Sequence, residues 1–139
     1  MTTDSRSYLL LVRTSAWYDL VVTAAFMTPW TYGLLHEALS LGPLPEGSPL
    51  PVLYANLMGS VVVVWALLRA LRPLPLHGFL DGVARVLFAT WQAYALAHGA
   101  AAVVGLFLVV EVAFGLAQLA PWARPNAWRN RPRLRPETP

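Results

Sequence analysis

The sequence is poor in charge and has neither cysteine nor lysine. The absence of cysteine excludes disulfides, thiolate metal sites and cysteine nucleophiles. Charged residues make up 12% of the 139 residues, about half of the ~25% that is typical of soluble domains. The HExxH, glycine-rich phosphate-loop and GxSxG motifs are also missing, so the sequence shows no established catalytic machinery.

Long apolar runs take the place of the missing charge, and clusters of proline and glycine divide them. The first run covers residues 17–35 and is followed by LGPLPEGSPLP. The second covers residues 52–71 and ends at RPLPLHG. Pro29 is the only proline inside a run, and we expect it to bend the first helix.

The third apolar stretch, residues 79–120, is too long for one membrane crossing. As a single helix it would be roughly 60 Å long, about twice the hydrocarbon thickness of a bilayer. The only weak point is AHGA at residues 97–100. We therefore expect a tight turn there, joining spans 79–97 and 100–120.

Four spans predict an all-α, integral membrane four-transmembrane-helix bundle over residues 1–121, followed by a basic tail over residues 122–139. Charge placement supports this division, because with four spans every arginine falls on one side of the membrane. These arginines are Arg6, Arg13, Arg69, Arg72, Arg85, Arg124, Arg129, Arg131, Arg133 and Arg135. The positive-inside rule makes that side cytoplasmic, so both termini are expected in the cytoplasm, with the chain in a bacterial inner membrane.

The tail, WARPNAWRNRPRLRPETP, is rich in proline and arginine. A basic segment beside a membrane is typical of an electrostatic contact with anionic lipid, and docking onto a protein partner is the alternative. No aromatic stacking platform accompanies the charge, so we expect no binding to nucleic acid.

Each predicted span gathers its polar and small residues on one face, because residues three, four or seven positions apart share a helix face. Lipid penalises polar groups, so we expect these faces to converge inside the bundle. The resulting intramembrane polar site comprises Asn56, Ser60, Gln92, Glu111 and Gln118.

Glu111 lies near the middle of the fourth span, in the stretch LFLVVEVAFG. A charged acid at the bilayer centre costs roughly 2.5–3.5 kcal/mol, and the arginines are expected at the cytoplasmic ends, out of reach unless Arg85 extends inward. Burial therefore favours the protonated acid, which would donate a hydrogen bond to Gln92 or Ser60 and hold the helices together. A ligand or proton site, and an interface with another membrane subunit, are the two alternatives.

Asp81 and Arg85 are four residues apart with the acid first, the favourable order for an ion pair within a helix. Asp19 begins the first span at a similar depth, and we expect it to share Arg85 in an ion-pair cluster. His36 and His98 fall at the outer ends of spans, where an interfacial histidine is the ordinary reading. Their spacing matches no metal motif, so we expect neither a metal nor another cofactor.

The segments RTSAWYDL, YANLMGSVVVVWALLR and DGVARVLFATWQAYAL fall in the first three spans. In these segments and in its four-span layout, the chain resembles the DoxX-like group of small bacterial four-helix membrane proteins. The resemblance covers most of the chain, implies a small inner-membrane protein and carries over no functional residues. Small multidrug transporters also have four short helices and one membrane glutamate, but theirs is in the first helix, whereas Glu111 is in the fourth.

For function, we expect a non-catalytic membrane protein that binds a lipophilic small molecule within the bundle or serves as a subunit of a homo-oligomer or larger membrane complex. One alternative is a proton-coupled small-molecule transporter that uses Glu111 and needs an oligomer for alternating access. The other is a membrane enzyme acting on a lipid or isoprenoid substrate, with Glu111 or Asp81 as acid or base.

Overall fold

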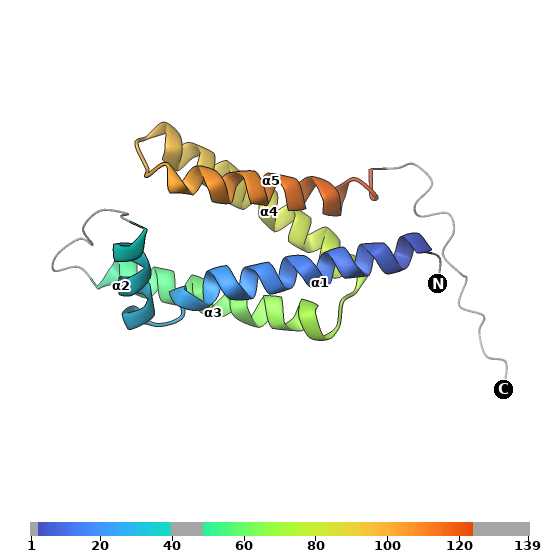
Figure 1. The fold of residues 1–139 in the computed structure, drawn as a ribbon, viewed down its shortest axis with the longest axis horizontal. Coiled ribbons are helices and arrows are strands. Elements are labelled where there is room, and N and C mark those ends of the chain that lie inside the picture. Colours follow the sequence, from blue (N-terminus) through green and yellow to red (C-terminus); the bar gives the residue numbers. More distant parts are fainter. Residues whose placement is uncertain (1–2, 40–48, 124–139) are drawn as a thin grey trace.

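The computed structural model describes residues 3–39 and 49–123, and this part of the chain is helical without strands, as the sequence predicts. The elements in chain order are α1 (Thr3–Thr23), a 3-10 turn η1 (Ala24–Phe26), α2 (Pro29–Ala38), α3 (Leu50–Leu71), α4 (Pro75–Ala97) and α5 (Val103–Leu119) (Figure 1). Two stretches, Ser5–Phe26 and Leu50–Leu71, are long and apolar enough to cross a membrane.

The first helix differs from the predicted span 17–35. It begins at Thr3, continues through Arg13 and ends at Thr23. Arginine is a good helix former, and the exposed Arg13 donates from Nε to the backbone oxygen of Ala70 at 2.9 Å.

Pro29 was expected to bend the first helix. Instead it begins a separate helix, α2. Proline suits the first position of a helix because its missing N–H has no partner there in any case. Thr28 caps the new helix, and its Oγ1 accepts a hydrogen bond from the Thr31 backbone N–H at 3.1 Å. The short helix α2 then lies against η1 and α3.

The other predicted spans lie within a few residues of α3, α4 and α5. The predicted turn at residues 97–100 is also present. Gly99 has a φ of 91°, a backbone conformation that favours glycine, and the Ala100 N–H donates to the Ala95 oxygen at 3.0 Å. The predicted basic tail lies outside the described residues from Arg124 onward.

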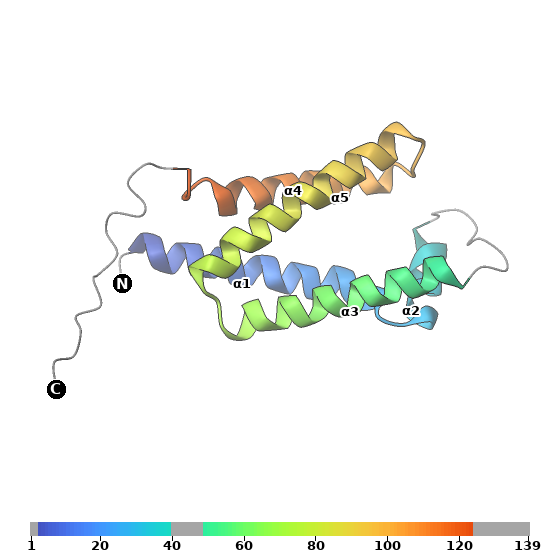
Figure 2. The ribbon, with the colours of Figure 1, turned by 180° about the vertical axis from the view of Figure 1, so that it is seen from behind.

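The helices form two pairs, α1 with α3 and α4 with α5, and the pairs meet where α1 contacts α4 and α5 (Figures 1 and 2). The N-terminus of α1, the connection from α3 to α4 and the C-terminal end of α5 lie at one end of the bundle (Figure 1). The turn between α4 and α5 lies at the other end, as does α2. Neighbouring long helices in the chain therefore run in opposite directions.

Burial is reversed relative to a water-soluble protein. In the described chain, five buried residues are hydrophobic: Val12, Ala16, Val63, Ala66 and Ala70. Seven are polar or charged: Ser15, Asp19, Arg69, Asp81, Arg85, Glu111 and Gln118. Large apolar side chains such as Val21, Val61 and Leu106 are exposed by 79%, 69% and 69%. The polar groups thus make the interior and the apolar ones the surface.

Candidate functional site

Five ionisable side chains from all four long helices meet where the two helix pairs join. This buried charge cluster consists of Asp19 on α1, Arg69 on α3, Asp81 and Arg85 on α4, and Glu111 on α5. Every one of them is linked to another by an ion pair. Three carboxylates face two guanidinium groups, so the cluster has a formal charge of −1 when all five are ionised.

Arg85 is the centre of the cluster, because it contacts all three carboxylates. Its Nη2 donates to both oxygens of Asp19 at 2.9 and 2.8 Å, and its Nε donates to Asp81 Oδ2 at 3.1 Å. Its Nη1 donates to Glu111 Oε2 at 2.7 Å. The predicted grouping of Asp19, Asp81 and Arg85 is thus present as a set of direct contacts, and each nitrogen of the Arg85 guanidinium has a carboxylate partner.

Arg69 is the second cation of the cluster, although its place in the sequence predicts only a position at the cytoplasmic end of a span. It is fully buried and pairs with Asp19 through Nη2 and with Asp81 Oδ2 through Nη1 at 2.6 Å. The same Nη1 donates to Ser15 Oγ at 3.1 Å. Extending the polar face of the second span does not find it, because nine residues at 3.6 per turn place Arg69 half a turn away from Ser60.

Neutral donors surround Asp81 and satisfy its remaining oxygen positions. Gln118 Nε2 donates to Asp81 Oδ2 at 2.8 Å, and Trp65 Nε1 donates to Oδ1 at 3.2 Å. Ser15 Oγ lies 3.3 Å from Oδ2 and also accepts from Gln118 Nε2 at 2.9 Å. Asp81 is therefore held by charged and neutral donors together, as a carboxylate in a poorly hydrated interior requires.

Aromatic rings cover the two guanidinium groups. The Phe114 ring centroid lies 4.9 Å from Arg85 Cζ, and the Tyr18 centroid lies at 6.0 Å. Trp65 faces Arg69 with 5.5 Å between the ring centroid and Cζ. Contacts of this kind stabilise a cation that has lost its hydration.

The predicted polar site around Glu111 differs from the observed arrangement. Glu111 pairs with Arg85 and contacts neither Ser60 nor Gln92 by a hydrogen bond. Arg85 lies 12 residues before the end of α4 and Glu111 lies 8 residues after the start of α5, so their depths differ by about four residues, roughly 6 Å. A long arginine side chain covers that difference. Arg85 therefore extends inward to Glu111, the arrangement that was expected only as an exception.

The other members of the predicted polar site are separated. Gln118 joins the charge cluster, whereas Asn56 and Ser60 lie near the break after α1. Asn56 Nδ2 donates to the Phe26 backbone oxygen at 3.2 Å, and Ser60 Oγ donates to the Asn56 oxygen at 2.8 Å. Gln92 Oε1 is enclosed and has no hydrogen-bond partner in the described chain.

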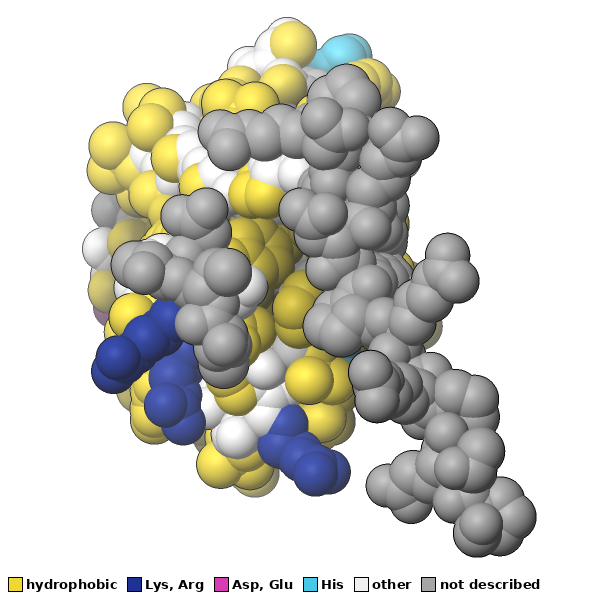
Figure 3. All heavy atoms as spheres, turned by 90° about the vertical axis from the view of Figure 1, so that its right-hand side faces the viewer, with side chains coloured by type: hydrophobic (Ala, Val, Ile, Leu, Met, Phe, Trp, Pro, Cys, Tyr) yellow, Lys and Arg dark blue, Asp and Glu magenta, His cyan; other side chains and the backbone are white. Residues whose placement is uncertain are grey.

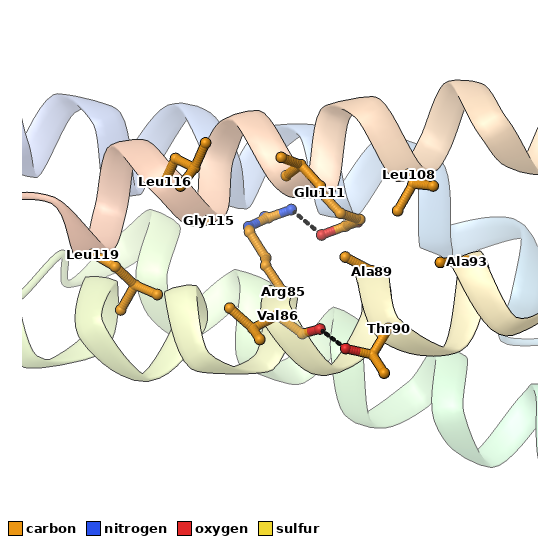
Figure 4. Close-up of a pocket in the computed structure, with 11 residues that line it drawn as sticks. Arg85, Val86, Ala89, Thr90, Ala93, Leu108, Glu111, Gly115, Leu116 and Leu119 are labelled. Atoms are coloured by element: carbon orange, nitrogen blue, oxygen red, sulfur yellow. Dashed lines mark hydrogen bonds and ion pairs between the residues drawn. The ribbon is translucent and has the colours of Figure 1, made fainter.

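A pocket of about 380 Å³ lies between α4 and α5 and has the Arg85–Glu111 ion pair in its wall (Figure 4). We call it the α4–α5 pocket; its apolar lining includes Ala89, Ala93, Leu108, Leu116 and Leu119. It opens on the side of the bundle, where Val86, Val112 and Leu116 are exposed by 51%, 43% and 67%. A second pocket of about 300 Å³ lies against Asp19, Trp65, Asp81 and Phe88.

The described histidines make no hydrogen bond or ion pair with the charge cluster, although His77 packs against Trp65 with 5.5 Å between the ring centroids. His98 Nδ1 is 2.8 Å from the Tyr94 backbone oxygen, and His77 Nδ1 is 3.1 Å from the Arg72 oxygen. Across residues 3–39 and 49–123, no group of three or more histidine or acidic side chains could hold a metal ion. The ionisable chemistry of the described chain is therefore concentrated in the charge cluster and the pocket beside it.

Comparison with known proteins finds no matching family model, no similar curated protein and no similar solved structure.

Proposed function

We propose that the chain is a four-span protein of the bacterial inner membrane that binds a lipophilic small molecule in the α4–α5 pocket and has no catalytic role. The observation that carries this proposal is the reversed burial, with charges inside and large apolar side chains outside. In water such an exterior would favour aggregation, whereas in lipid it matches its surroundings. The layout-level resemblance to the DoxX-like group agrees with this assignment.

Helix length supports four crossings. The stretches Ser5–Phe26 and Leu50–Leu71 each have 22 residues, and α4 has 23, about 33–35 Å at ~1.5 Å per residue. The helix α5 has 17 residues, about 26 Å, slightly less than the ~30 Å hydrocarbon core, a mismatch that local thinning of the bilayer accommodates. The charges of α4 do not oppose insertion, because they are paired inside the bundle.

The exposed arginines support the orientation. Among the described residues, Arg6, Arg13 and Arg72 are the exposed arginines. Arg6 lies in the first turn of α1, Arg13 lies midway along α1 and bonds the Ala70 oxygen near the end of α3, and Arg72 follows α3. Figure 3 views the end of the molecule that holds the start of α1 and shows arginine side chains among hydrophobic ones. If this end faces the cytoplasm, the connection from α1 to α3 and the turn between α4 and α5 lie on the opposite side of the membrane.

The pocket supports binding of a lipophile. Its walls are mainly leucine, valine and alanine, and one ion pair provides the polar group that orients a ligand. Its volume lies within the ~300–1,000 Å³ of small-molecule sites. Because it opens on the apolar side of the bundle, a molecule dissolved in the bilayer reaches it without passing through water.

Ala93→Leu tests the proposed site, because Ala93 is exposed and lines the α4–α5 pocket without contacting the charge cluster. The leucine side chain would occupy part of the α4–α5 pocket. The matched control is Ala113→Leu, at an exposed position of α5 that does not line this pocket. Solvent extraction of the purified proteins, followed by mass spectrometry, should show a lipophile bound to the natural chain and to Ala113→Leu but depleted from Ala93→Leu. Equal amounts in all three proteins, or none in any, would contradict the proposal.

A further inference from the structure

We propose that the α4–α5 pocket takes a lipophilic amine, with the hydrocarbon chain in the groove and the ammonium group against Glu111. This inference rests on the proposed function and names the chemical class of its ligand.

The charge balance of the cluster favours a cation. When all five groups are ionised, Asp19, Asp81 and Glu111 carry three negative charges, and Arg69 and Arg85 carry two positive ones. In an apolar surrounding an uncompensated charge is costly, so the cluster is most stable when one further positive charge adjoins it. A cationic head group provides that charge.

Glu111 is the carboxylate with the fewest donors. Asp19 receives both guanidinium groups, and Asp81 receives both as well as Gln118 and Trp65. Glu111 receives only Arg85 Nη1, at Oε2, and within the described chain no donor pairs with its Oε1. The side chain of Glu111 is 10% exposed and lines the α4–α5 pocket, so the unbalanced charge of the cluster lies where a ligand enters.

An anionic head group does not fit the same position. Arg85 also lines the pocket, but its Nε, Nη1 and Nη2 each donate to a carboxylate of the cluster. An anion would find at most the second hydrogen of Nη1 without a carboxylate, and it would add to the negative charge already present. The polar part of the pocket therefore distinguishes amine from acid, whereas the leucine and alanine walls accept any hydrocarbon chain.

Three probes with the same hydrocarbon chain test the inference: dodecylamine, dodecanol and dodecanoate. Each is added at equal concentration to the purified full-length chain in detergent, and native mass spectrometry measures the fraction of protein with one bound molecule. We expect dodecylamine to bind more tightly than dodecanoate by roughly tenfold or more, the size expected for a hydrogen bond to a charged group, with dodecanol between them. Ala93→Leu should weaken binding of all three, and Ala113→Leu should leave it unchanged.

Glu111→Gln gives an independent measure of the head-group contact. The amide keeps the shape of the side chain and its acceptor for Arg85 but removes the negative charge. The preference for dodecylamine over dodecanol should disappear, while the alcohol still binds. The order of the three probes on the natural chain decides the inference even if this variant fails to fold.

The outcomes separate the two proposals. Equal binding of all three probes, or stronger binding of dodecanoate, overturns the amine inference; sensitivity to Ala93→Leu then leaves the proposed lipophile site in place. Binding that Ala93→Leu and Ala113→Leu reduce equally, or no binding of any probe, overturns both.

Discussion

Arg85→Met should lower the free energy of unfolding of the bundle more than any single substitution at the surface. The substitution keeps an unbranched side chain of similar length but removes the group that pairs with Asp19, Asp81 and Glu111. Arg69 would then be the only cation facing three carboxylates, so the formal charge of the cluster would change from −1 to −2. Two of these carboxylates would keep a guanidinium partner and Glu111 would have none.

The expected loss in the free energy of unfolding is about 3–5 kcal/mol, the usual cost of removing one partner from a buried ion pair. Glu111→Gln added to Arg85→Met leaves two carboxylates and one guanidinium, a formal charge of −1 as in the natural chain. The double variant should therefore recover a large part of the loss. The difference in the free energy of unfolding between the double variant and Arg85→Met measures the cost of the uncompensated charge. The part of the loss that is not recovered includes the lost packing of the arginine side chain.

Unfolding by sodium dodecyl sulfate in mixed micelles, followed by the fluorescence of the six tryptophans, measures these differences. Arg6→Met is the matched control, because Arg6 is exposed, and we expect it to change stability by no more than ~0.5 kcal/mol. The reasoning fails if Arg85→Met unfolds within about 1 kcal/mol of the natural chain. It also fails if the double variant is no more stable than Arg85→Met, because the charge imbalance would then have no measurable cost.

Two further predictions concern packing and orientation. Gly59→Ala should destabilise the fold by ~1–3 kcal/mol in the same titration, because its Cβ would lie 2.7 Å from the backbone carbon of Phe26. Gly33→Ala has nothing within 4 Å of the new Cβ and should be neutral or stabilising by up to ~1 kcal/mol; equal effects of the two changes would refute the contact argument. In a chain without native cysteine, Ala102→Cys should react with a membrane-impermeant maleimide on intact cells and Leu74→Cys only after permeabilisation, and the opposite pattern would reverse the orientation.

Much of the helix layout could be predicted because proline, glycine and apolar runs act locally. The turn at Gly99 and the connection after Leu71 follow from backbone preferences that need no tertiary information. The extent of α1 could not be predicted from apolar runs, because the helix starts with the polar residues TDSRS and contains Arg13, whose acceptor belongs to Ala70, 57 positions along the chain. Whether a charge in an apolar run ends a helix or lies inside it depends on tertiary contacts, and periodicity does not reveal these contacts.

The candidate site was predictable to a similar degree. Helical spacing places Asp81 beside Arg85, and similar depth brings Asp19 to the same pair. Depth counted along single helices made pairing of Glu111 with Arg85 only an exception, because it gave little weight to the length of an arginine side chain extending along the bundle. Arg69 was assigned to the membrane surface for the same reason, since its position at a helix end was taken as the position of its charge.

If the chain spans the membrane as proposed, the distribution of the charge cluster over the two helix pairs bears on how it would enter the bilayer during synthesis. The first pair contains Asp19 and Arg69, one charge of each sign, so this hairpin can neutralise itself as soon as α3 follows α1. The second contains Asp81, Arg85 and Glu111, and Arg85 can pair with both carboxylates before the first hairpin is reached. Each hairpin would thus leave the translocon with its cation already matched, and the one carboxylate charge in excess would belong to the second hairpin.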